Sequence, residues 1–109
     1  MKKTLFIIFA FISININAQV EKNAKKLTDE MTTVMELSQE ESDKLYEMNL
    51  KRMKKMRKIR NENKDMDKDE LKELFKPIQK NYSKELRTMV GDEKMKKWVD
   101  YRKEKKAKQ

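Results

Sequence analysis

The chain has 109 residues, 43% of them charged, and its 28 basic and 19 acidic side chains give a formal net charge of +9. It contains neither Cys nor His, which excludes disulfides and Cys- or His-based metal sites and removes the commonest nucleophiles and general bases. We therefore expect one small domain that is not an enzyme and has no cofactor and no metal site.

The first 18 residues have the organisation of a secretory signal peptide. Lys2 and Lys3 precede an apolar run, Leu5–Ile12, and the small residue Ala18 lies at its exit. The run is too short for a membrane-spanning helix. We expect cleavage after Ala18, export across the inner membrane to the periplasm, and a single helical domain over residues 19–109.

Two helices are predicted in the first half of this domain. Apolar residues at helical spacing indicate a helix over residues 20–35. Ser38, followed three residues later by Glu41, forms a capping box, so a second helix is expected over residues 39–61. The apolar stripe of the first comprises Val20, Ala24, Leu27, Met31, Val34 and Met35, and that of the second comprises Leu45, Met48, Met53, Met56 and Ile59.

Two more helices are predicted after a polar loop. Asp67 with Glu70 repeats the capping pattern and begins a helix over residues 68–89, in which Pro77 should cause a kink or a break. Gly91 is expected as a left-handed stop and Asp92 as the N-cap of a last helix over residues 92–105. The apolar stripe of the third helix comprises Leu71, Leu74, Phe75, Ile78, Tyr82, Leu86 and Met89, and Trp98 should pack the fourth helix onto the others.

Two corners of the predicted domain are alike, each with an apolar residue, a small residue, an acid-rich first turn and then Lys and a large apolar residue. They read Leu37-Ser38-x-x-Glu41 and Val90-Gly91-x-x-Lys94. This layout resembles the Spy/CpxP-type periplasmic proteins, whose mark is Leu-Thr-x-x-Gln repeated at helix starts. In the first copy Ser and Glu replace Thr and Gln and keep the capping chemistry, whereas Gly and Lys in the second do not.

The resemblance implies an all-α domain of four helices in a curved, hairpin-like arrangement that forms a homodimer. It also implies a stress-response role, either as an ATP-independent chaperone that binds unfolded or partly folded proteins, or as a periplasmic partner or inhibitor of an envelope-stress sensor.

A basic segment of the second predicted helix is the candidate binding surface. Seven of the ten residues 51–60 are Lys or Arg, interleaved with Met and Ile. Met side chains adapt to many shapes, and long cationic side chains cover apolar surface while their charged ends meet carboxylates. The candidate residues for binding partly folded proteins are Lys51, Arg52, Met53, Lys55, Met56, Arg57, Ile59 and Arg60.

Several alternatives stay open for the same segment. Its apolar residues could be core and its cations a solvated face, or the segment could be the seam of the dimer. Basic amphipathic helices also bind anionic membrane surfaces, although this one has neither Trp nor Phe. The thioethers of Met53 and Met56 could hold Cu(I), but no His or Cys is present to complete such a site. Export argues against nucleic acid as a partner.

Overall fold

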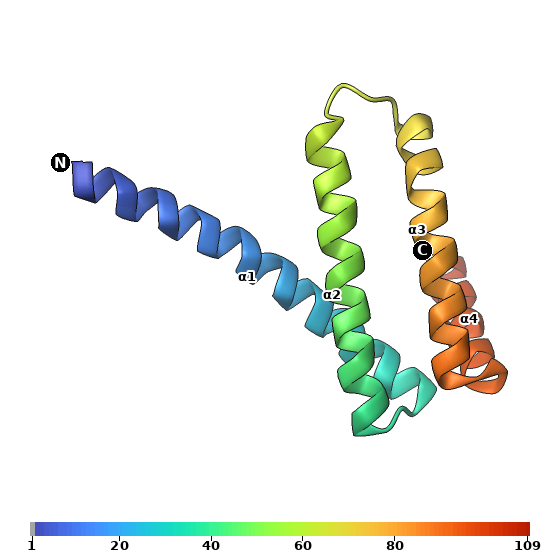
Figure 1. The fold of residues 1–109 in the computed structure, drawn as a ribbon. Coiled ribbons are helices and arrows are strands. Elements are labelled where there is room, and N and C mark those ends of the chain that lie inside the picture. Colours follow the sequence, from blue (N-terminus) through green and yellow to red (C-terminus); the bar gives the residue numbers. More distant parts are fainter. Residues whose placement is uncertain (1) are drawn as a thin grey trace.

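The computed structural model describes the backbone of residues 2–109 and the side chains of residues 18–109. The chain forms four helices, α1 (Lys2–Met35), α2 (Gln39–Glu62), α3 (Lys68–Val90) and α4 (Asp92–Ala107), and the described residues contain no strand (Figure 1). The predicted all-α class with four helices is therefore confirmed.

The helix bounds agree with the sequence patterns except at the amino-terminal end. Helices α2, α3 and α4 begin at the predicted residues and end within two residues of the predicted ends. Helix α1 begins at Lys2 instead of about residue 20, so the predicted signal peptide is continuous with the first helix. The side chains of residues 1–17 lie outside the described part, and cleavage after Ala18 stays a prediction.

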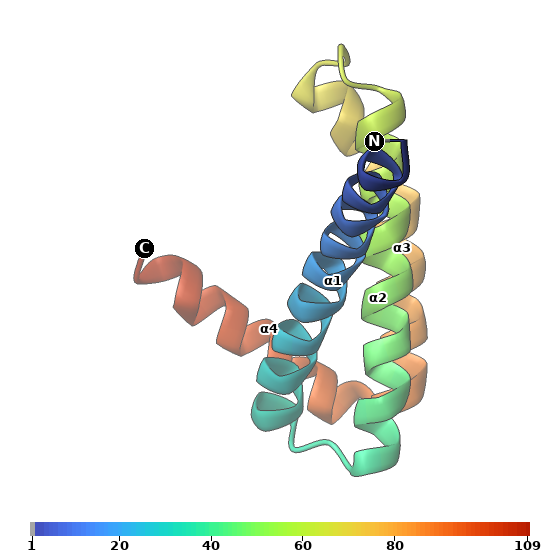
Figure 2. The same cartoon turned by 90° about the vertical axis from the view of Figure 1, so that its left-hand side faces the viewer.

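Helices α2 and α3 form an antiparallel hairpin, and α1 and α4 lie on one side of it. In Figure 1 both α1 and α4 pass behind the hairpin, and Figure 2 shows both on the same side of α2 and α3. Helix α1 packs against α2 and α4, while α4 also packs against α3. Away from these crossings the amino-terminal half of α1 extends away from the hairpin (Figure 1), and the carboxyl end of α4 does so as well (Figure 2). The opposite face of the hairpin is covered by neither helix.

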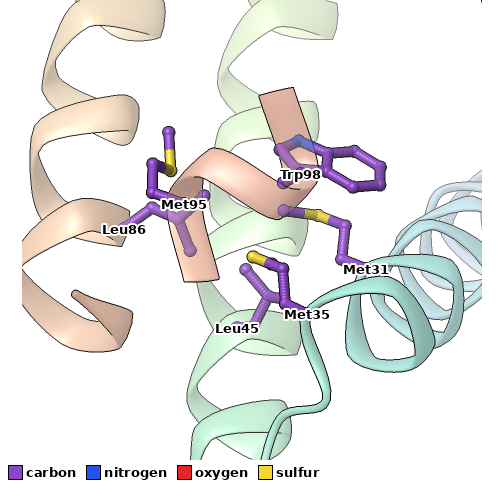
Figure 3. Packing of buried hydrophobic residues seen from close by; sticks show 6 residues of the cluster. All are labelled: Met31, Met35, Leu45, Leu86, Met95 and Trp98. Carbon is purple, nitrogen blue, oxygen red and sulfur yellow. The ribbon is translucent and has the colours of Figure 1, made fainter. Parts of the chain in front are cut away.

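The core lies where the four helices meet. Its buried side chains come from all four helices and point toward one another in Figure 3: Met31, Met35, Leu45, Leu86, Met95 and Trp98. Trp98 is buried against α1 residues, which confirms that it packs α4 onto the other helices. Leu37, the first residue of the Leu37-Ser38 corner, is half-buried against the same cluster.

The apolar stripes of the hairpin extend beyond this core. In α3 only Leu86 is fully buried, and Leu74 keeps 40% of its surface exposed. The half-buried remainder near the free end of the hairpin comprises Met53, Met56, Ile59, Leu71, Phe75 and Ile78. The radius of gyration, 17.0 Å, exceeds the roughly 13 Å of a compact domain of this length. The projecting half of α1 contributes to this extended shape, and α1 and α4 cover only one end of the hairpin.

The Ser38 corner has the predicted capping box. The Ser38 hydroxyl accepts a hydrogen bond from the backbone N–H of Glu41 (3.2 Å), and the Glu41 carboxylate accepts one from the backbone N–H of Ser38 (3.0 Å). Just before it, Glu36 adopts a φ of 54°, and the N–H of Leu37 donates to the Thr32 carbonyl (3.1 Å), which closes α1. The two helices are thus joined by a tight corner that these hydrogen bonds close.

The other three predicted caps require correction. Asp67 is the N-cap of α3, but its side chain makes no capping hydrogen bond. Asp67 and Glu70 therefore do not form the predicted capping box. Gly91, not Asp92, is the N-cap of α4, and Asp92 is the first helical residue. Gly91 has positive φ as expected, but its φ of 90° and ψ of 165° lie outside the left-handed helical region, in a region that only glycine reaches easily.

Pro77 does not interrupt α3, which runs through it as one helix, so the predicted break does not occur. The proline lacks the backbone N–H that would donate one helical hydrogen bond, and its ring crowds the carbonyl four residues earlier. The helix nevertheless continues on both sides of it, from Lys68 to Val90.

The two corners that resemble each other in sequence lie side by side. The Lys94 ammonium is 2.9 Å from the Glu41 carboxylate, with both side chains largely covered. The Lys94 hydrogen bond, and then the backbone N–H of Ser38, hold the pKa of Glu41 below its usual value. The Glu41 side chain therefore caps α2 and fastens α4 to it at the same time.

Candidate functional site

The uncovered face of the hairpin carries a groove. It has a volume of about 850 Å³, and none of its lining residues belongs to α1 or α4. Apolar side chains from both helices line it together with four cations and two carboxylates. The lining comprises Glu47, Met48, Leu50, Lys51, Arg52, Lys54, Lys55 and Ile59 of α2 and Leu74, Pro77, Ile78, Asn81, Tyr82 and Glu85 of α3.

The predicted binding residues do not form one face. Lys51, Lys55 and Ile59 line the groove. Met53, Met56, Arg57 and Arg60 line a second hollow of about 540 Å³ on the α1 side, together with Val20, Asn23 and Asn61. Arg52 lines both hollows. The division follows from helix geometry, because each residue is turned by about 100° from the one before and ten residues surround the helix.

Arg52 is held in place between α2 and α3. Its guanidinium carbon lies 4.0 Å from the ring centroid of Tyr82, and its Nη1 donates a hydrogen bond to the Gln79 side-chain oxygen (2.8 Å). Its Nε atom is buried and has no hydrogen-bond partner. Burial is the main cause that lowers the pKa of the Arg52 guanidinium, and the positive charge of Arg102 adds to the lowering. Arginine nevertheless stays protonated in proteins, so a half-buried positive charge remains.

The cations of the groove form no ion pairs with carboxylates among residues 18–109. No ion pair joins Arg52, Lys51, Lys54 or Lys55 to any carboxylate of residues 18–109, whereas Lys58, outside the groove, pairs with Glu62 at 4.0 Å. Further along the hairpin the guanidinium of Arg60 lies 5.3 Å from the Phe75 ring centroid and also bridges α2 and α3. The segment therefore presents uncompensated positive charge next to apolar side chains.

A buried polar network below Arg52 was not predicted from the sequence. Thr28 donates to the Ala24 carbonyl (2.7 Å), and the Asn49 amide nitrogen donates to the Thr28 hydroxyl (2.9 Å). The Tyr82 hydroxyl donates to the Asn49 side-chain oxygen. Burial raises the pKa of Tyr82, so this hydroxyl keeps its proton. The network joins α1, α2 and α3 and fixes the ring on which Arg52 lies.

The sequence carried one signal for this network. Asn49 follows Leu45 by four residues and so lies on the apolar face of its helix, where an amide needs a partner. That signal identifies a buried polar residue, but it does not identify Thr28 and Tyr82 as its partners.

The described part of the chain contains neither a cluster of metal ligands nor a membrane-spanning helix. Among the described side chains, no group of three or more Asp, Glu, Cys or His residues comes together to hold a metal ion. The thioethers of Met31 and Met35, which are four residues apart on one helix face, belong to the core. Within the same part of the chain, no helix has the length and apolar character needed to cross a membrane.

Comparison of the chain with protein-family models, with curated proteins and with solved structures gave no match.

Proposed function

We propose that this protein is an exported, ATP-independent chaperone-like protein that binds partly folded proteins in the groove between α2 and α3. The observation that supports the proposal is the groove itself, which combines half-exposed apolar side chains with unpaired cations. It also agrees with the role implied by the resemblance to the Spy/CpxP-type proteins.

Each part of the groove has a role in such binding. Removing apolar side chains such as Leu74 from water lowers the free energy when a partner binds. Met48 can adapt its shape to different partners. The cations attract acidic chains over about 10 Å at 0.1 M salt, so binding should weaken as salt is added. A groove of this kind favours weak binding of many partners over tight binding of one shape.

A dedicated partner, such as an envelope-stress sensor, is the second candidate function. The observation that favours it is the fixed position of Arg52, which is held by Tyr82 and Gln79 before any partner arrives. A preorganised side chain loses little entropy on binding and so favours a defined partner.

The predicted homodimer is also a proposal. The hollow that contains Met53 and Met56 provides apolar surface on the α1 side that a second copy could cover. Sedimentation analysis of the purified protein over a range of concentrations tests it, and a monomer at all concentrations would contradict it.

Aggregation assays separate the two candidate functions. The purified protein is mixed, without ATP, with each of two unrelated aggregating proteins while light scattering is followed. Suppression of both at near-stoichiometric amounts is expected of a general chaperone. Suppression of neither would contradict that function and lead to a search for one membrane partner by pull-down.

A matched pair of variants tests whether the groove is the surface used. Lys55→Glu reverses a charge in the groove, and Lys58→Glu reverses one on the same helix outside it. We expect the first to reduce suppression of acidic clients and the second to leave it nearly unchanged. Equal loss in both variants would mean that only net charge matters.

A further inference from the structure

Arg52 differs from the other cations of the groove in its surroundings. Lys51, Lys54 and Lys55 are exposed, whereas Arg52 is half-buried beside Tyr82 and lacks a carboxylate partner among residues 18–109. Taking a charge out of water without a counter-charge is unfavourable. Binding of a negatively charged group from a partner is therefore most favourable at a site of this kind.

The hydrogen-bonding capacity of Arg52 is also largely unused. A guanidinium has five N–H donors, and the one side-chain acceptor that Arg52 bonds is Gln79. Its Nε has no partner either, but it is buried, so the Nη hydrogens are the ones left for a partner molecule. Planar guanidinium groups pair with carboxylates through two parallel hydrogen bonds, which are stronger than neutral ones.

We propose that Arg52 is a carboxylate-binding site and that the groove accepts an acidic, apolar segment of a bound polypeptide, with a Glu or Asp side chain on Arg52. The inference rests on the proposed function and names the class of segment that it selects. The support is charge complementarity, since the groove has four cations and only two carboxylates, Glu47 and Glu85. Apolar neighbours such as Ile59 and Leu74 would contact the leucine-like residues beside the acidic one.

The test uses two labelled peptides that differ only in charge. One is amphipathic, with leucines at helical spacing and glutamates beside them, and the other has glutamine in place of each glutamate. Binding to the purified protein is measured by fluorescence anisotropy. We expect the glutamate peptide to bind roughly tenfold more tightly or better, as charged hydrogen bonds do. Equal binding of the two peptides would overturn the inference.

Two variants assign the discrimination to Arg52. In Arg52→Gln the ratio of the two dissociation constants should fall several-fold toward the level that the exposed lysines of the groove maintain. In Lys58→Gln, which loses the same charge outside the groove, it should stay close to that of the unmodified protein. An unchanged ratio in Arg52→Gln would overturn the inference. If that variant does not fold, Arg52→Lys replaces it, and an undiminished ratio there would likewise overturn the guanidinium site.

Further measurements separate this inference from other occupants and from the proposed function. If inorganic phosphate displaces the peptide as well as the unlabelled peptide does, or if Arg52→Gln converts a dimer to a monomer, the polypeptide site is overturned. Peptide discrimination without suppression of aggregation would support the site and contradict the chaperone function. Suppression of aggregation without discrimination between the two peptides would support the chaperone function and contradict the carboxylate site at Arg52.

Discussion

Removing the amide of Asn49 should destabilise the fold through the Tyr82 hydroxyl. Asn49→Leu keeps the number of side-chain heavy atoms but removes the acceptor of Tyr82 and the donor to Thr28. Thr28 keeps its own bond to the Ala24 carbonyl, whereas the half-buried Tyr82 hydroxyl is left with only a weak acceptor, the Met31 sulfur at 3.6 Å. Two lost hydrogen bonds and one poorly paired hydroxyl sum to about 2–4 kcal/mol of unfolding free energy. In a domain of this size the melting temperature should fall by on the order of 10–20 °C.

A double-mutant cycle with Tyr82→Phe tests the reasoning. That variant keeps the ring beneath Arg52 and removes only the hydroxyl, so it should lose about 1–2 kcal/mol. In the double variant no group is left unpaired, and its loss should be smaller than the sum of the single losses by about 1 kcal/mol or more. Urea unfolding followed by circular dichroism at 222 nm measures all three variants. Strict additivity would refute the claim that this hydrogen bond stabilises the fold.

Three further predictions concern the corners. Ser38→Ala removes one half of the capping box and should lower the unfolding free energy by about 0.5–2 kcal/mol in urea unfolding, and no loss would contradict the cap. Gly91→Ala should lose about 1–2 kcal/mol through backbone strain alone, since no heavy atom lies within 4 Å of the added Cβ; unchanged stability would show that the chain relaxes there. Lys94 lowers the pKa of Glu41 in the fold. The ionised Glu41 carboxylate therefore adds to the unfolding free energy above its usual pKa of 4.5, and this contribution is lost as the pH falls through the folded pKa. Glu41→Gln should therefore lower stability at pH 7 and flatten the acid limb of a stability–pH curve, and an unchanged limb would assign acid unfolding to other carboxylates.

The sequence determined the helices because the information for them is local. Apolar spacing, the scarcity of Gly and Pro and the Ser38 capping pattern set α2, α3 and α4 to within two residues. Local patterns were less reliable where a cap depends on detailed backbone geometry. Asp67 and Asp92 are good capping residues by type, yet neither side chain caps a helix here.

The tertiary structure decided which apolar residues form the core and what surrounds Arg52. The stripe of α3 is continuous in sequence, but α1 and α4 cover only one end of the hairpin, so Leu86 is buried and Leu74 is exposed. A hydrophobic period identifies the face of a helix and cannot tell how far a neighbouring helix extends along it. Likewise, Asn49 and Arg52 form hydrogen bonds with residues that lie 21 to 33 positions away in the sequence. Such contacts are fixed only when the helices pack, and for that reason the sequence alone could not place them.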